Sequence, residues 1–160
     1  MPKLGFKIII SIFEEFQGRT LMDVNQILAD TKTIAVVGLS NRPDRPSYQV
    51  ASYMQQAGYK IIPVNPALND VVLQEIPYPD LFTVSQEHNV DLVNIFRRSE
   101  TAAEIVDQSI LISAKAIWMQ LGIANEKAAE KAQAHGLKVI MNRCIMVDHK
   151  LWCESQEMLV

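Results

Sequence analysis

The sequence predicts an α/β fold: a Rossmann-like, doubly wound, five-stranded parallel sheet with helices on both faces. The first observation is a set of short runs rich in β-branched residues and apolar on both sides, as in buried parallel strands. The second is that these runs alternate with helical segments of about ten to fifteen residues, which favours right-handed βαβ units. The third is that four of the six glycines stand at predicted element ends: Gly38, Gly58, Gly122 and Gly136.

The first half of the domain contains two predicted helices, each followed by a strand. Proline is tolerated in the first turn of a helix and glycine is common just past its end, so Pro46 and Gly58 bracket the second helix. Its expected apolar face carries Val50, Met54 and Ala57. The predicted elements are a helix at Val24–Leu28, a strand at Thr33–Val37, a helix opened by Pro46-Ser47 and a strand at Tyr59–Pro63.

The second half contains three further predicted strands. The prolines of Ile76–Pro79 exclude a central strand there, because proline donates no ladder hydrogen bond. Ser99 and Asn125 precede apolar-periodic segments, where such side chains cap helices. The predicted elements are a short helix near Pro79–Gln86, a strand at Asp91–Phe96, a helix after Ser99 with the face Ala102, Val106, Ile110 and Ser113, a strand at Lys115–Met119, a helix from Asn125 to His135 and a strand at Leu137–Met141.

Residues 1–20 differ in character from the rest of the chain. Glutamates interrupt their apolar run and no small-residue cleavage site follows, so we predict no secretory signal. No apolar stretch approaches the roughly 20 residues needed to span a bilayer. We therefore expect a cytoplasmic protein. Because termini are ordered only when tied down, we expect a loosely ordered extension at 1–20 and one domain at 21–160. The alternatives are an edge strand, an amphipathic anchor and a true start at Met22.

The composition indicates a globular protein and argues against several classes of function. Of the 160 residues, 49% are hydrophobic and 21% are charged, as in an ordinary single domain. The net charge of −3 argues against general nucleic-acid binding, which needs a broad basic face. The two cysteines form no CxxC pair and the three histidines lie far apart, so neither a disulfide framework nor a metal site is predicted.

Five of the six arginines follow predicted strands, at the carboxyl edge of the sheet, where open α/β sheets bind ligands. A guanidinium offers a planar fork of donors that suits phosphate or carboxylate. The pattern therefore predicts a site for a small polyanion. These arginines are Arg42, Arg45, Arg97, Arg98 and Arg143.

The loop after the first strand argues against the usual binding of NAD. A dinucleotide fingerprint reads GxGxxG, with a carboxylate about 20 residues further on. Here only Gly38 remains, and the second strand ends in Val64-Asn65-Pro66 without an acid. The loop still leads into a helix whose first amides and Ser47 hydroxyl suit a phosphate.

Five motifs in order closely resemble the small stand-alone CoA-binding proteins of bacteria and archaea, relatives of the CoA-binding domain of the succinate–CoA ligase alpha subunit. The resemblance covers roughly residues 31–150. It departs from the family at Leu73-Gln74-Glu75, where a glycine is usual. The motifs are Val37-Gly38-Leu39-Ser40 with Arg45-Pro46-Ser47-Tyr48, Pro63-Val64-Asn65-Pro66, Phe96-Arg97-Arg98-Ser99, Trp118-Met119-Gln120-Leu121-Gly122 and Asn142-Arg143-Cys144.

The resemblance implies that the ligand is coenzyme A. Its pyrophosphate is expected on the first loop and the start of the following helix, where arginines neutralise phosphate charge. Its adenosine end is expected beside the loop after the second strand, and its pantetheine arm above the loop after the fourth. The expected binding residues are Gly38, Leu39, Ser40, Arg42, Arg45, Ser47, Asn65, Pro66, Phe96, Arg97, Trp118, Gln120, Leu121 and Gly122.

Some of these residues also have a purely structural interpretation. Ser47 is a typical helix-start residue, the two loop arginines suit solvated charges, and Phe96 and Trp118 suit a hydrophobic core. Gln120 favours a functional role, because a buried polar side chain after a strand needs a partner.

No residues form a convincing catalytic set, so we expect a non-enzymatic carrier, sensor or regulatory module. Cys144 is the one reactive candidate, because the charge of Arg143 would favour its thiolate. A mixed disulfide with the thiol of coenzyme A is a hypothesis, and a small buried hydrophobe is the alternative. Cys153 lies in a C-terminal tail for which no element is predicted.

Three other functions remain open. An NAD(P)-binding oxidoreductase or redox sensor would need an acidic or phosphate-selecting residue after the second strand, where Asn65 stands. A ligase fragment would gain catalysis from a separate partner chain, and a purely structural domain leaves the arginines unexplained. We expect no nucleic-acid or membrane partner. A homodimer is open, since family members of this size often look dimeric.

Overall fold

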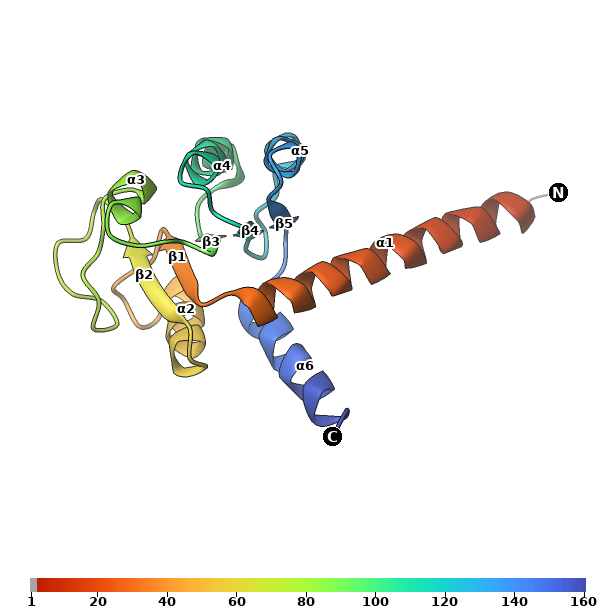
Figure 1. The fold of residues 1–160 in the computed structure, drawn as a ribbon, viewed down its shortest axis with the longest axis horizontal. Helices are drawn as coiled ribbons and strands as arrows, with labels where there is room; N and C mark the ends of the chain where they lie inside the picture. The colour runs from red at the N-terminus through yellow and green to blue at the C-terminus, as the bar shows by residue number, and fades with distance from the viewer. Residues whose placement is uncertain (1–2) are drawn as a thin grey trace.

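The computed structural model describes residues 3–160 as helices around one parallel sheet (Figure 1). The elements are α1 (Lys3–Asp30), β1 (Thr33–Val37), α2 (Pro46–Gln56), β2 (Lys60–Val64), α3 (Leu81–Ser85), β3 (Leu92–Ile95), the 3₁₀ turn η1 (Ser99–Thr101), α4 (Ala102–Leu111), β4 (Ala116–Met119), α5 (Glu126–Ala134), β5 (Lys138–Ile140) and α6 (Ile145–Glu157). The strand order is β2-β1-β3-β4-β5, with all neighbours parallel. This order confirms the predicted five-stranded, doubly wound α/β fold.

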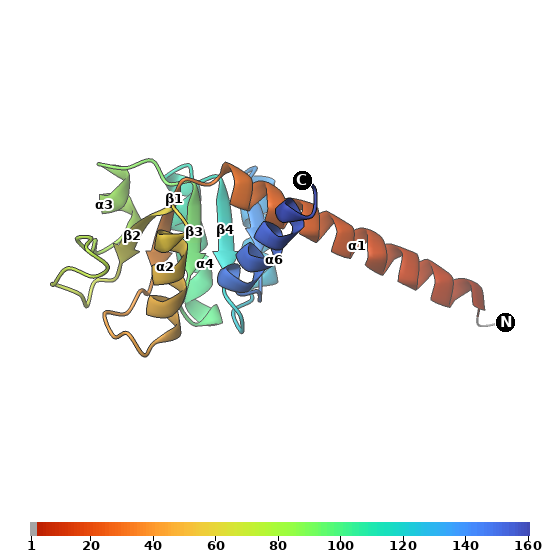
Figure 2. The same ribbon diagram turned by 90° about the horizontal axis from the view of Figure 1, so that it is seen from below.

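Alternate strand residues build a hydrophobic core on each face of the sheet. In β1, Ala35 and Val37 pack with α3, α4 and α5. Ile34 and Val36 pack with α2, α6 and the end of α1 on the opposite face (Figures 1 and 2). The strand runs are apolar on both sides because both faces are covered.

The two terminal helices differ most from the sequence prediction. α1 begins at Lys3 rather than near Val24, and its buried residues lie in its last two turns. Its first half projects past the β5 side of the sheet (Figure 1). This half exposes apolar side chains such as Ile9. α6 occupies the C-terminal segment for which no element was predicted. None of the helices in the described chain is long and apolar enough to cross a membrane.

Smaller corrections concern the helix faces. Ala57 is the exposed residue after α2, and Ala51 takes the expected buried position. Ser113 lies exposed beyond α4, whereas Ser109 is buried on its face. Ser99 begins η1 rather than capping α4 directly. The predicted cap at Asn125 is confirmed: its side chain accepts a hydrogen bond from the third residue of its helix.

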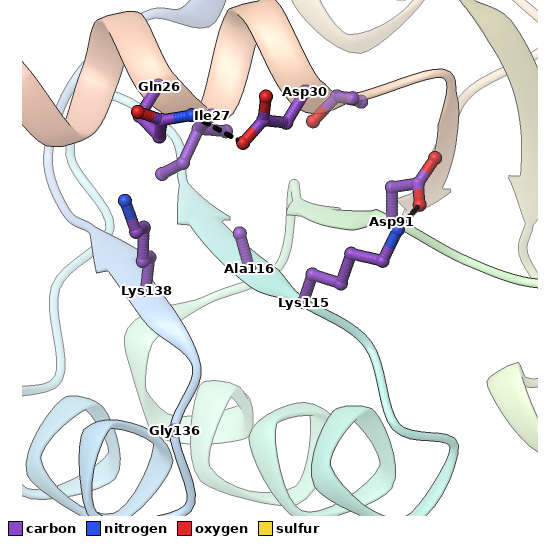
Figure 3. A pocket seen from close by; sticks show the side chains of 9 residues that line it. Gln26, Ile27, Asp30, Asp91, Lys115, Ala116, Gly136 and Lys138 are labelled. Atoms are coloured by element: carbon purple, nitrogen blue, oxygen red, sulfur yellow. Dashed lines mark hydrogen bonds and ion pairs between the residues drawn. The ribbon is translucent and has the colours of Figure 1, made fainter.

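A charged cluster ties together the amino edge of the sheet (Figure 3). The Asp91 carboxylate accepts hydrogen bonds of 3.0 Å from the amides of Lys32 and Thr33, and Lys115 Nζ lies 2.7 Å from its other oxygen. Burial alone would raise the pKa of Asp91, but these hydrogen bonds outweigh it and lower that pKa below its ordinary value. Asp91 therefore fastens β1 to the starts of β3 and β4.

A tight turn of residues other than glycine lies between β2 and α3. Leu73 and Gln74 have φ angles of 51° and 65°, and the amides and carbonyls of Val72 and Glu75 bond across them. The Leu73 carbonyl also accepts a hydrogen bond of 2.8 Å from Gln55 on α2. The departure from the family's usual glycine therefore falls on a left-handed backbone position.

Candidate functional site

The candidate site lies where the loops after β1 and β3 separate to opposite faces of the sheet. Gly38 ends β1 with a φ of +89°, and a Cβ atom there would lie 2.5 Å from the carbonyl oxygen of Phe96, after β3. Only glycine fits such an approach. This is the topological switch point of the sheet, where α/β proteins of this strand order bind ligands.

The first loop folds back onto the start of α2. The Ser47 hydroxyl accepts a hydrogen bond of 3.0 Å from the Ser40 amide, and the Ser40 hydroxyl accepts one of 3.1 Å from the Arg42 amide. Ser47 is buried beneath the loop and shapes it. Leu39 is also buried in the core, so its contribution to a ligand site is its backbone.

The start of α2 carries no capping side chain. The same holds for α4 and α6, whereas Asp80 caps α3 and Asn125 caps α5. The first amides of α2 therefore remain for an anion, which the helix dipole also favours. Arg45 stands at the N-cap position with an exposed side chain, and none of the ion pairs found in residues 3–160 involves it. Arg42 instead pairs with Asp44 at 2.9 Å.

Asn65 joins the loops that follow β1, β2 and β3. Its amide nitrogen donates to the Leu39 carbonyl at 3.0 Å. Its oxygen accepts from Arg97 Nη2 at 3.3 Å and from the Ala67 amide at 3.0 Å. Pro66 follows on the exposed side of the turn. The arrangement brings Arg97 beside the first loop, as the sequence predicts.

A cavity of about 520 Å³ opens between the starts of α2 and α6 and the loops after β3 and β4. Apolar side chains form most of its wall and two arginines stand among them, an arrangement suited to an arm that carries a charged end. Cys144, the residue before α6, belongs to this wall. The lining residues are Pro46, Val50, Phe96, Arg97, Arg98, Gln120, Leu121, Ile123 and Cys144.

Gln120 lies at the base of this cavity. It is 3% exposed, and its amide nitrogen donates to Asn94 Oδ1 at 2.8 Å. Asn94, inside β3, is not among the residues that the sequence predicts for the site. The signal that could have identified it is a single asparagine within the apolar run Leu92–Ile95. Gly122 donates its amide to the Asn142 side chain at 2.7 Å, which holds the loops after β4 and β5 together.

Two residues lie elsewhere than expected. Trp118 is fully buried in the α2/α6 core, and its indole donates to the Arg143 carbonyl at 2.9 Å. It therefore supports the loop after β5 and does not line the cavity. The Arg143 guanidinium forms two hydrogen bonds with Asp148 of α6, at 2.7 and 2.5 Å. This ion pair holds the Arg143 guanidinium against α6.

Comparisons relate this chain to known proteins. Residues 32–150 match the family model described as a CoA binding domain. The Bacillus subtilis (strain 168) protein YneT, described as uncharacterized, is 39% identical over an alignment of 140 residues, and the match covers 83% of this chain and 96% of that protein. A hypothetical protein from Pyrococcus horikoshii OT3 is 33% identical, with a TM-score of 0.78 over 83% and 92% of the two chains. The dinucleotide-forming acetyl-coenzyme A synthetase 1 of Ca. Korarchaeum cryptofilum shares the fold at 22% identity and a TM-score of 0.58, over 69% of this chain and 26% of that one.

Proposed function

Because the chain belongs to the family of CoA-binding domains, we propose that it binds coenzyme A or an acyl-CoA at the carboxyl edge of its sheet. The role we propose is that of a carrier, sensor or regulatory module without catalysis. The observation that carries the proposal is the meeting of an uncapped helix start with an apolar cavity at the switch point. These two features match two parts of the ligand, its pyrophosphate and its pantetheine arm.

In this binding mode the pyrophosphate lies on the first amides of α2, and Arg45 neutralises its charge. The adenosine end lies beside Asn65 and Pro66. The pantetheine arm enters the cavity past Phe96 and Arg97, towards Gln120 and Leu121. Its amides suit hydrogen bonds at the polar base of the cavity, and its methyl groups suit the apolar wall.

Thermal-shift and calorimetric titrations with coenzyme A, acetyl-CoA, NAD and NADP test the proposal. A ligand of the folded state alone adds about 2.7 kcal/mol of stability at one hundred times its Kd. We expect this gain from coenzyme A and not from NAD. Stabilisation by NAD without stabilisation by coenzyme A would contradict the assignment.

Arg45→Ala gives a residue-level test of the same site. Loss of a charged hydrogen bond costs about 1.5–3 kcal/mol, so the Kd for coenzyme A should rise by roughly tenfold or more. The melting temperature without ligand should stay unchanged, because the Arg45 side chain is exposed. Arg42→Ala is the matched control and should weaken binding less, since Asp44 already compensates that charge. A large fall in stability without ligand would make Arg45 structural.

A further inference from the structure

A second cluster of reactive side chains lies on the α2/α6 face of the sheet, away from the carboxyl-edge cavity. His149 and Cys153 stand one turn apart on α6, and Tyr53 of α2 reaches the same imidazole. Cys153 Sγ is 3.7 Å from both ring nitrogens of His149, and the Tyr53 hydroxyl is 2.9 Å from Nδ1. Thiol, imidazole and phenol therefore form one contiguous set.

The surroundings of His149 keep its imidazole neutral and oriented. The residue is 6% exposed, and Tyr53 and Tyr59 meet its ring edge-on at 5.5 Å. This burial lowers the pKa of His149, so the neutral form dominates at neutral pH. In the tautomer in which Nδ1–H donates to the Tyr53 hydroxyl, the lone pair of the neutral imidazole lies on Nε2, 3.7 Å from Cys153 Sγ.

Cys153 also lines a cavity. It is a free, partly exposed thiol in the wall of a cavity of about 580 Å³ at the amino edge of the sheet. Lys32, Gly58 and Tyr59 line the same cavity. The volume admits the tail of a small thiol compound, and the exposed lysine attracts a carboxylate on that tail.

We propose that Cys153 is a thiol-modification site for low-molecular-weight disulfides that carry carboxylates, with His149 as the proton acceptor. His149 takes the proton of the Cys153 thiol, and the thiolate attacks one sulfur of the disulfide. The disulfide bond breaks as the new sulfur–sulfur bond forms. The displaced thiolate takes the proton from the imidazolium and leaves as a thiol, so a mixed disulfide on Cys153 is the only change to the protein.

The two cysteines of the chain make a sharp test, because Cys144 lies in the other cavity. In a Cys144→Ala background, the reaction of Cys153 is followed by absorbance with anionic 5,5′-dithiobis(2-nitrobenzoate) and with neutral 4,4′-dithiodipyridine. His149→Gln should slow both reactions by about tenfold or more, since general base catalysis contributes at least that much. Lys32→Gln should slow the anionic reagent alone, by about two- to threefold.

Two further measurements keep the proposal open to refutation. Tyr53→Phe preserves the ring packing and should slow both reagents, which gives a readout even if His149→Gln fails to fold. After incubation of the wild-type chain with glutathione disulfide, peptide mass spectrometry should find the glutathionyl group on Cys153. The assignment would be overturned if the His149 and Tyr53 variants reacted as fast as the chain without these substitutions. Modification confined to Cys144 would also overturn it.

Discussion

At the scale of single residues, the loops of the site keep their positions only if certain residues are unchanged. Gly38 is the clearest example, because it combines a left-handed backbone with a close approach to the Phe96 carbonyl. Asn65 is another, since three loops bond to its one side chain. The expectation that Gly38 ends a strand follows from its sequence pattern. Two partners of Asn65, Leu39 and Arg97, lie 26 and 32 residues away, and only the fold reveals them.

Gly38→Ala should lower the free energy of unfolding by about 2–4 kcal/mol, because strain at positive φ adds to overpacking against Phe96. Gly58→Ala is the matched control. Gly58 has a φ of +103° but open space around it, so the loss should be near 1 kcal/mol. Urea unfolding measures both, and equal losses would contradict the role given to the close approach.

Asp91 should make the free energy of unfolding depend on pH in the acidic range. Its pKa is lowered in the folded state, so its contribution is complete above the ordinary aspartate pKa of about 4 and is lost as the pH falls through the lower folded value. Asp91→Asn should cost about 1–2 kcal/mol at neutral pH. Urea midpoints of wild type and variant, measured from pH 7 downwards, should converge in acid. If the difference between the two urea midpoints stays constant across this pH range, the charge of the Asp91 carboxylate does not stabilise the fold.

At the scale of elements, sequence periodicity misses a helix whose buried face carries ionisable side chains. The buried face of α6 carries Asp148 and His149, so its apolar pattern is broken. In α1 the reverse holds: apolar residues crowd the stretch Ile8–Phe13 without a clear period, and the stretch is exposed. The strands were predicted correctly because both of their faces are apolar.

The turn between β2 and α3 offers a stabilising substitution. Gln74→Gly removes a side chain from a left-handed position that costs roughly 1–2 kcal/mol, against an entropic loss of roughly 0.5–1 kcal/mol. The melting temperature should therefore rise by a few degrees. Gln74→Ala keeps the Cβ atom and should bring no gain. If both variants melt like the wild type, the backbone of this turn is not strained.

Removal of residues 1–20 tests the proposed boundary of the domain. The helix segment before residue 21 exposes side chains such as Ile9 and Phe13, at 66% and 60%, so thermal unfolding of 21–160 should resemble that of the full chain. Val24→Ala, at a buried position of α1, should instead cost about 1–3 kcal/mol. A comparable loss in the truncated chain would show that the extension belongs to the folded domain.

At the scale of the whole molecule, strand order determines which predicted residues meet. The loops that carry Gly38, Asn65, Arg97 and Gln120 converge because all strands are parallel and their carboxyl ends share one edge. Trp118 was expected to bind the ligand, but strand residues alternate between faces and its side chain points into the α2/α6 core. Arg143 was expected to join the other arginines of the site, but it pairs with Asp148 in α6, a helix that was not predicted from the sequence.

The parallel topology also directs the two chain ends. α1 ends at Asp30, immediately before the amino edge, and α6 begins beside the carboxyl-edge cavity and runs back across the sheet, so the end of α6 lies away from that cavity (Figure 2). A molecule immobilised on a sensor chip through its C-terminus thus turns its cavity towards the flowing solution. Affinities recorded on such a surface should equal those measured with the protein in bulk.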